Sequence, residues 1–304
     1  MNLPLVLSVL LSACLSLPAG AAPASPAPTP ASAPARETVV WYVNNFPPYS
    51  ITLGPDTGTG INDRAMALLI KNMPQFQHKV VDAALPRTIE AMKTRPDACS
   101  VSLLRTAERE TVMHFSKPRS LVLPNAVVTL RQRAGLLKPY MNPQGELMLD
   151  AMLSAGKLTL GLSSDRSYGP SIDGLIKAHP SAIVNIPAKD QFESRLLKLV
   201  NQHEFDAILG YAIELKYTAR ALKLDIGQLV AYPIAESSEL LAPGVACSKS
   251  DQGLRIITAI ERVLADENLR REMDADYRSR LDDESAAHYD RLLQKRRAAE
   301  GAPR

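Results

Sequence analysis

Arg109 is the first candidate in this sequence for binding an anion. It lies in "SLLRTAERETVMHFSKP" (residues 102–118), three residues after Thr106, which can cap a short helix. A guanidinium near the free N–H groups of a helix start can hold a carboxylate or phosphate through two hydrogen bonds. The alternative is an ordinary surface arginine paired with Glu108 or Glu110, and spacing alone favours that alternative.

Aromatic and polar side chains in two other loops could complete a binding site. Phe46 and Tyr49 lie in "NNFPPYS", where paired prolines prevent both a helix and strand pairing, and their rings could form an aromatic wall. Arg166, Ser167 and Tyr168 lie in the Ser-rich loop "SSDRSYG" and could supply further hydrogen-bond donors. Taken singly, a polar loop or a buried ring is more often structural than part of a site.

Motifs of catalysis and metal binding are missing from the sequence. It contains no G-x-S-x-G, no H-E-x-x-H, no C-x-x-C and no phosphate-binding glycine loop. The histidines are isolated from one another, at His78, His114, His179, His203 and His288. We therefore expect no enzyme, no cofactor and no metal site.

Alternating strands and helices must position the candidate loops. Apolar runs predict strands over 38–43, 78–83, 97–104, 157–162, 182–186 and 205–210. Helical spacing predicts helices over 60–73, from 86, over 146–155, 171–178, from 190 and over 252–265, with a charged helical tail to about 297. Strand–helix–strand alternation predicts an α/β fold with parallel strands, here as two units in series.

The carboxyl ends of parallel strands are where ligands bind in open α/β sheets, because loops and helix starts converge there. Four loops follow such ends, "NNFPPYS" and "RTAER" in the first unit, and "SSDRSYG" and "GYAIE" in the second. This rule adds Ser102, near the end of the strand before Arg109, and Tyr211, in the last of the four loops. The sequence thus predicts a site to which both units contribute.

The N-terminal region has the composition of a targeting segment. Its Leu/Val stretch is too short to span a bilayer, and the small residues 19–21 suit signal-peptide cleavage, so residues 1–21 are predicted to be a secretory signal. The alternative is a lipoprotein, with Cys14 as the lipidated residue. Residues 22–36 are rich in Ala and Pro and are predicted to be an extended linker.

Composition argues against one class of partner, nucleic acid, and does not decide whether two of the cysteines are paired. The 304-residue chain has a net charge of +3 with its Lys and Arg spread along the sequence, so we expect no nucleic-acid binding. After signal removal, Cys99 and Cys247 could pair in an oxidising compartment or stay buried and free. The residues alone favour free cysteines.

A family resemblance becomes visible in "IEAMKTRPDACSVSLLRTAERETVMHFSKP" (residues 89–118). Its helix, Asp-Ala, strand, Thr-x-x-Arg and Phe-Ser-x-Pro resemble the signature of type II periplasmic solute-binding proteins of family 3, the polar amino-acid binders. The resemblance implies two lobes that close over a ligand by hinge motion, each a mainly parallel sheet flanked by helices. We expect lobe 1 to comprise residues 37–126 plus 238–298, and lobe 2 residues 127–237.

The resemblance also assigns roles to individual residues. Arg109 matches the arginine that clamps the ligand carboxylate, and Phe46 matches the aromatic residue that lies against the ligand. The strand of Cys247 would return to lobe 1 beside that of Cys99, which makes a disulfide more plausible. Tyr211, however, stands where amino-acid binders usually place the aspartate for the ammonium group.

Other departures from the family concern the residues around the ligand carboxylate and the first helix. Leu104 replaces a small hydroxyl residue, and Ile61-Asn62 replaces an aromatic-Asp pair. A buried ammonium group without an acidic partner costs several kcal/mol or more. A carboxylate, phosphate or aromatic anion therefore suits the site better than an unmodified amino acid.

The predicted function is that of a monomeric periplasmic solute-binding protein. It would capture a small anionic solute, which bears a carboxylate and can be amino-acid-like, between its two lobes and pass it to an inner-membrane ABC-type permease or to a sensor. One alternative is an enzyme on the same fold, such as a cyclohexadienyl-type dehydratase, with Glu214 or His114 as the acid or base. The other is a signalling or interaction module that binds no small molecule.

Overall fold

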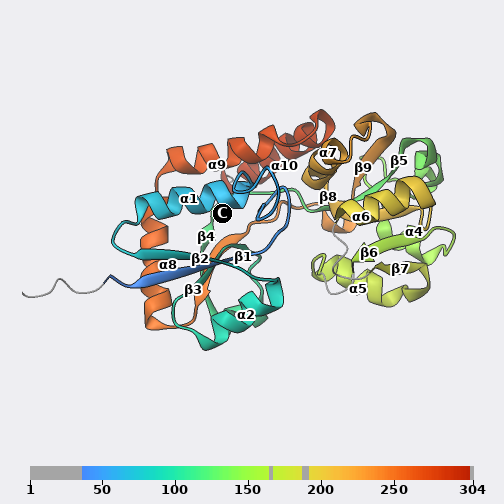
Figure 1. Cartoon of the computed structure of the whole chain (residues 1–304). Helices are drawn as coiled ribbons and strands as arrows, with labels where there is room; N and C mark the ends of the chain where they lie inside the picture. The colour runs from blue at the N-terminus through green and yellow to red at the C-terminus, as the bar shows by residue number, and fades with distance from the viewer. Residues whose placement is uncertain (1–35, 164–166, 187–191, 302–304) are drawn as a thin grey trace, which may run out of the picture. The chain divides into compact units, whose positions relative to one another are not determined.

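The computed structural model describes residues 36–163, 167–186 and 192–301 (Figure 1). The predicted signal peptide, nearly all of the linker, Cys14, Arg166 and the predicted helix start at Asp190 lie outside these residues. Within the described ranges the chain folds as two five-stranded sheets flanked by helices, as the sequence predicts for its fold class. No helix in these ranges is long and apolar enough to cross a membrane.

The first sheet has the strand order β2-β1-β3-β10-β4, in which β1 pairs in parallel with both β2 and β3. Its strands are β1 (Thr38–Val43), β2 (Gln77–Asp82), β3 (Ala98–Leu103), β4 (Met113–Pro118) and β10 (Gly244–Ser248). Strand β10 lies antiparallel between β3 and β4. The sheet is thus completed by a strand from near the end of the chain.

Helices cover both faces of the first sheet because side chains alternate along its strands. Odd-numbered residues such as Trp41 pack against α1 (Ile61–Asn72) and α8 (Asp251–Leu264). Even-numbered residues such as Tyr42 pack against α2 (Leu85–Thr94). Near-continuous apolar strands are typical of a sheet covered on both faces.

The second sheet has the order β7-β6-β8-β5-β9, with β6 parallel to both β7 and β8. Its strands are β5 (Asn125–Leu130), β6 (Leu160–Ser163), β7 (Ile183–Ile186), β8 (Ala207–Tyr211) and β9 (Leu229–Pro233). One face packs on α4 (Leu149–Ser154) and α5 (Pro170–Ala178), the other on α6 (Phe192–Leu197) and α7 (Ala212–Ala221). The limits predicted for the two lobes stay predictions.

Two C-terminal helices follow α8, namely α9 (Glu267–Ser279) and α10 (Asp283–Gly301). Met273 of α9 packs on the core of the first sheet, whereas Tyr277 and Tyr289 belong to a separate buried cluster with the loop residue Tyr49 and with Ile213 of α7. The predicted helical tail is confirmed, and it contacts more than one part of the fold.

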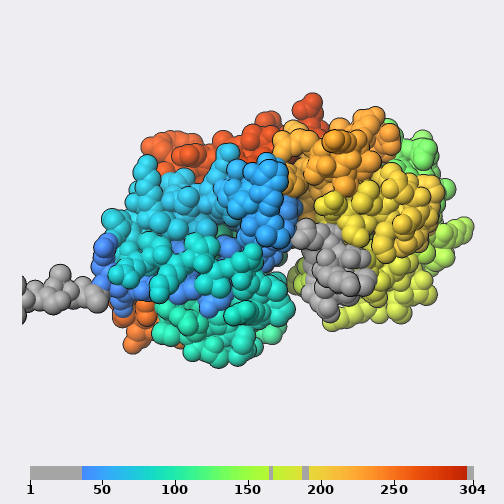
Figure 2. Space-filling view, in the orientation of Figure 1, coloured from blue at the N-terminus to red at the C-terminus, as the bar shows by residue number. Residues whose placement is uncertain are grey.

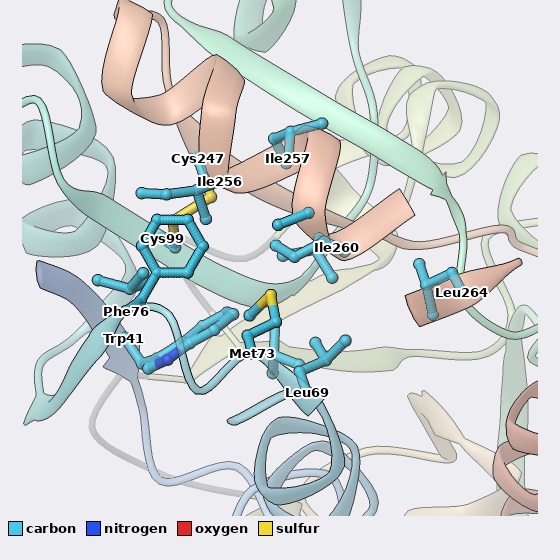
Figure 3. Packing of buried hydrophobic residues seen from close by; sticks show 14 of the residues in the cluster. Trp41, Leu69, Met73, Phe76, Cys99, Cys247, Ile256, Ile257, Ile260 and Leu264 are labelled. Atoms are coloured by element: carbon cyan, nitrogen blue, oxygen red, sulfur yellow. A yellow bond between two sulfur atoms is a disulfide. The ribbon is translucent and has the colours of Figure 1, made fainter. Parts of the chain in front are cut away.

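Cys99 and Cys247 form a disulfide in the core of the first sheet (Figure 3). They are directly opposite in the antiparallel pair of β3 and β10, and both are fully buried beside Trp41. The expectation of free cysteines, drawn from the residues alone, is wrong. The pairing implied by the family resemblance is confirmed, because β10 returns to lie next to β3.

Some elements were not predicted from the sequence. Strand β4 follows directly after the short helix α3 (Ala107–Glu110), and β5 and β9 pair antiparallel with each other. Strand β5 follows β4 with no helix between them, and β4 follows a helix of only four residues, so the alternation rule did not find these two strands. The predicted loop "GYAIE" is also shorter than expected, because α7 begins at Ala212.

Candidate functional site

In each sheet, the strands that precede the candidate loops end at the same edge. In the first sheet, Trp41 of β1 is in register with Cys99 of the parallel strand β3, so the loops that follow both strands leave the same edge. In the second sheet, Gly161 of β6 is in register with Ile208 of β8. The structure therefore confirms that each sheet presents two of the four predicted loops at one edge.

Arg109 is held at the end of β3 by its own short helix. The hydroxyl of Thr106 accepts a hydrogen bond from the Arg109 N–H at 3.2 Å, and the guanidinium Nη1 donates to the Leu104 carbonyl at 2.8 Å. Ser102, on β3 itself, is partly buried. One bond to a carbonyl leaves most of the five guanidinium N–H groups for other acceptors.

Burial and charge act on Arg109 in opposite directions. Partial burial lowers the pKa of its guanidinium, and the negative charge of Glu108 raises it. Glu110, one of the two expected surface partners, instead pairs with Arg105 at 3.3 Å. Arginine stays charged at neutral pH despite such shifts, so this position presents a partly desolvated cation.

Three of the predicted aromatic residues come together. The rings of Phe46 and Tyr49 stack with centroids 5.3 Å apart, and Tyr211 meets both edge-on, at 6.3 Å and 5.5 Å. Phe46 and Tyr49 belong to the loop after β1, whereas Tyr211 ends β8 in the second sheet. The aromatic wall therefore receives residues from both sheets, as a site shared by two lobes requires.

The loop that carries Phe46 and Tyr49 is fixed to the start of α1. The Asp63 carboxylate accepts hydrogen bonds from the Ile51 N–H at 2.8 Å and the Gly60 N–H at 2.9 Å. The Asn62 N–H donates to the Tyr49 carbonyl at 2.7 Å. The loop of the aromatic wall is thus held by a carboxylate and a backbone N–H at the start of α1 rather than by its own side chains alone.

Replacing Gly60 by alanine tests this support. The added Cβ would lie 2.4 Å from the Tyr49 carbonyl oxygen, a backbone atom that moves only with the loop. Such overpacking typically costs about 1–3 kcal/mol, so we expect Gly60→Ala to lower the free energy of unfolding by that amount in urea denaturation.

Gly174→Ala is the matched control. Gly174 is exposed within α5, and a Cβ there meets nothing within 4 Å. In an exposed helix, Gly→Ala stabilises by up to about 1 kcal/mol, so the two variants should change stability in opposite directions. Equal stability of Gly60→Ala and the wild type would show that the loop is not fixed as described.

The second-lobe loop is held by hydrogen bonds between residues around Tyr168 and neighbouring elements. This side chain is buried, and its hydroxyl accepts from the Ser163 N–H and from Nη1 of Arg195, both at 2.9 Å. The Ser167 hydroxyl donates to Asp173, and the Asn125 amide donates to the Tyr168 carbonyl at 3.3 Å. The buried Tyr168 side chain therefore supports the conformation of the loop to which it belongs. Arg166 lies outside the described residues.

Two buried arginines were missed by the sequence analysis. Arg119 is 1% exposed, its Nε donates to the Val101 carbonyl at 3.2 Å and its Nη2 bonds the Asn62 side chain. Burial lowers the pKa of Arg119 to about 10. Arg195 on α6 is equally buried and lies over the Phe192 ring at 5.5 Å. The only sequence signal for Arg119 is its position directly after Phe-Ser-x-Pro, in the mainly apolar segment that runs from β4 to β5.

Glu214, the acid or base considered for an enzyme, has a structural role at the start of α7. It is 1% exposed, and its Oε2 accepts a hydrogen bond from the Tyr211 N–H at 2.7 Å. A carboxylate in this position stabilises the free N–H groups of a helix start. It also fixes the backbone that carries Tyr211.

Comparisons with solved structures assign the fold. A histidine kinase sensor domain with similarity to periplasmic binding proteins is 15% identical, with a TM-score of 0.59 over 80% of this chain and 96% of that one. An ancestral cationic amino acid solute-binding protein is 15% identical, with a TM-score of 0.58 over 81% and 96%. The chain has the two-lobed periplasmic-binding fold.

A further neighbour with this periplasmic-binding fold was solved with its ligand. It is an amino acid ABC transporter substrate-binding protein from Streptococcus pneumoniae bound to L-arginine, 14% identical, with a TM-score of 0.56 over 83% of this chain and 94% of that one. No family model and no curated protein matches the chain by sequence. The neighbours thus include both transport proteins and sensor domains.

Proposed function

We propose that this protein is an extracytoplasmic solute-binding protein that captures a small anionic solute between its two lobes. The observation that carries the proposal is the partly buried Arg109 guanidinium, held by Thr106 and Leu104 at the end of β3. It lies on the same sheet edge as the loop of the aromatic wall. A charged donor beside aromatic rings is the usual composition of a site for a small organic anion.

The solute class follows from the charges that the site offers. Tyr211 occupies the position at which the family resemblance expects an aspartate, and it contacts Phe46 and Tyr49. An ammonium group would there meet a phenol in place of that aspartate, and a buried charge that loses its acidic partner costs several kcal/mol or more. We therefore propose a carboxylate- or phosphate-bearing solute without a free α-ammonium group, with Arg109 as its clamp.

The proposed location outside the cytoplasm has support from the cysteines. Disulfides persist in oxidising compartments and are rare in the cytosol, and Cys99 and Cys247 form one in the core. The predicted signal peptide agrees with such a location. The alternative is a lipoprotein that a lipid on Cys14 anchors to the membrane. The proposed partner is an inner-membrane ABC-type permease or a sensor, matching the two kinds of neighbour. We propose that the protein acts as a monomer.

A thermal-shift screen of the mature protein tests the proposal. The panel comprises amino acids, dicarboxylates, aromatic acids, inorganic phosphate and nucleotides, each measured with the wild type and with Arg109→Ala. We expect one class of anion to raise the melting temperature of the wild type and to leave that of the variant unchanged. The proposal fails if no compound stabilises the wild type, or if the stabilising compound acts equally on the variant.

The same incubations separate binding from catalysis. We propose no enzymatic activity, and the engagement of Glu214 with the Tyr211 N–H supports this. Mass spectrometry of each compound after incubation should recover it unchanged. A product formed by the wild type would replace the binding proposal with the dehydratase alternative.

A further inference from the structure

Two chain crossings join the sheets, and we call them the hinge pair. Residues 119–124 run from β4 to β5, and residues 234–243 run from β9 back to β10. They pair with each other at two points: Val122 and Leu241 exchange N–H···O bonds of 2.9 Å in both directions, and the Arg119 N–H donates to the Pro243 carbonyl at 3.2 Å. The rest of the hinge pair must be held by other parts of the fold.

Helix α9 supplies side-chain acceptors to the first crossing. The Leu123 N–H donates to the Tyr277 hydroxyl at 2.9 Å. The Asp274 carboxylate faces the Leu121 N–H, which lowers the pKa of that carboxyl, while burial raises it. Residues three apart lie on one face of a helix, and alternate residues of an extended segment point the same way. The two spacings match, so α9 faces two successive inward N–H groups of the crossing and hydrogen-bonds one of them, that of Leu123.

Tyr277 also contacts the candidate site. It is fully buried in a cluster that contains Tyr49 of the aromatic wall and Ile213 of α7, and its ring lies 5.3 Å from that of Tyr289. Burial raises the pKa of Tyr277, while the Leu123 N–H and the nearby Tyr49 hydroxyl lower it. The Tyr277 hydroxyl therefore lies between residues 46–50, which we call the ligand-facing loop, and the backbone of the first crossing.

The end of α9 is linked to the second sheet as well. Lys216 of α7 donates from Nζ to the Leu281 carbonyl at 2.9 Å, just after α9 ends. Near this point Asp56 of the loop before α1 pairs with Arg220 of α7 at 3.3 Å, and the loop and helix meet at the surface in Figure 2. The α9 region thus contacts the ligand-facing loop, the first crossing and α7.

We propose that Tyr277 is a positioning residue that couples the ligand-facing loop 46–50 to the hinge pair, with Asp274 as its companion on α9. The coupling serves ligand capture only if the proposed function holds. A displacement of Tyr49 shifts the Tyr277 hydroxyl, and that shift changes the anchoring of Leu123. The arrangement of the lobes therefore depends on a helix that holds neither Arg109 nor the aromatic wall.

Amide hydrogen exchange in Tyr277→Phe tests the coupling without a ligand. The variant keeps the ring and removes the acceptor of the Leu123 N–H. In protein labelled with ¹⁵N-leucine, ¹⁵N-phenylalanine and ¹⁵N-tyrosine, we expect exchange of the Leu123 amide to become about tenfold faster, the loss of one typical hydrogen bond. Exchange at Phe46 and Tyr49, whose amides bond within the loop, should accelerate with it.

Tyr289→Phe is the matched control. Tyr289 is a buried neighbour in the same cluster, and its hydroxyl has no hydrogen-bond partner among the described residues. Its variant should leave Leu123, Phe46 and Tyr49 at wild-type exchange rates. A general loosening of the cluster would accelerate them in both variants and would overturn the proposal, as would unchanged Leu123 exchange in Tyr277→Phe.

A second pair of variants keeps the test decisive if Tyr277→Phe fails to fold. Asp274→Asn retains a side-chain oxygen that faces the Leu121 N–H, whereas Asp274→Ala removes it. We expect Leu121 and Tyr49 to exchange faster in the alanine variant and near wild-type rates in the asparagine variant. Because these measurements use ligand-free protein, failure of the ligand screen leaves them interpretable, and equal rates in both variants would contradict the coupling.

Discussion

Replacing Cys99 and Cys247 together by valine is expected to lower the free energy of unfolding by about 2–5 kcal/mol, towards the upper end of that range. The disulfide joins residues 148 apart in the sequence, and the chain-entropy cost that it removes from folding grows with this separation. The enclosed segment contains the whole second sheet, β5 to β9. Since a domain of ordinary stability has about 5–15 kcal/mol in total, this change ranks among the largest available to the protein.

Urea denaturation followed by the fluorescence of Trp41 measures the effect. Trp41 is the single tryptophan of the sequence and is fully buried in the same cluster as the disulfide (Figure 3). Valine fills much of the space of each cysteine and suits a strand, so the loss should come from the missing link rather than from a cavity. A reducing agent should lower the midpoint of the wild type and leave the variant unchanged. Equal midpoints for the wild type and the variant would contradict the stabilising role.

Local patterns predicted the fold wherever one strand follows one helix. The runs at 38–43 and 97–104 and the helical spacing at 252–265 lie within one residue of β1, β3 and α8. The alternation rule does not predict strands that join a sheet from a distant part of the chain. Strand β10 pairs with β3 although their paired residues Cys247 and Cys99 are 148 apart in the sequence, and only the family resemblance indicated it.

The candidate site was predicted less completely than the fold. Loops at strand ends follow from topology, which is why Phe46, Tyr49 and Tyr211 were named and are found together. Arg119 and Arg195 were not named, because a charged side chain in a sequence is normally expected at the surface. Their burial depends on acceptors that the fold brings from other elements, such as Asn62 for the first and Tyr168 for the second. Spacing within one sequence contains no information on such partners.

The two lobes differ in how their loops are supported. In the first sheet, the support comes from the start of α1, where the Asp63 carboxylate and the Asn62 N–H bond backbone groups of the candidate loop. In the second sheet, a side chain of the loop itself provides the support, because the Tyr168 hydroxyl accepts hydrogen bonds from both Ser163 and Arg195.

Arg109→Ala is expected to weaken binding of the anion found in the screen by about 100-fold or more, because a charge-assisted pair that is partly desolvated costs about 2–5 kcal/mol to break. A ligand at 100 times its Kd stabilises a protein by about 2.7 kcal/mol, and at a concentration equal to Kd by about 0.4 kcal/mol. A 100-fold loss therefore reduces the first value to the second at the same ligand concentration. Arg109→Lys should be intermediate, since an ammonium group keeps the charge and loses the two-point contact.

Arg105→Ala is the matched control for this loss. Arg105 lies four residues earlier in the same loop, is exposed, and pairs with Glu110 at the surface. Its removal changes the net charge by the same amount, so a purely long-range electrostatic effect would weaken binding equally in both variants and would decline with added salt. Isothermal titration of the two variants at low and high ionic strength separates these cases. If Arg105→Ala lost as much affinity as Arg109→Ala, the solute would be attracted by the charge of the loop as a whole, and Arg109 would not be its clamp.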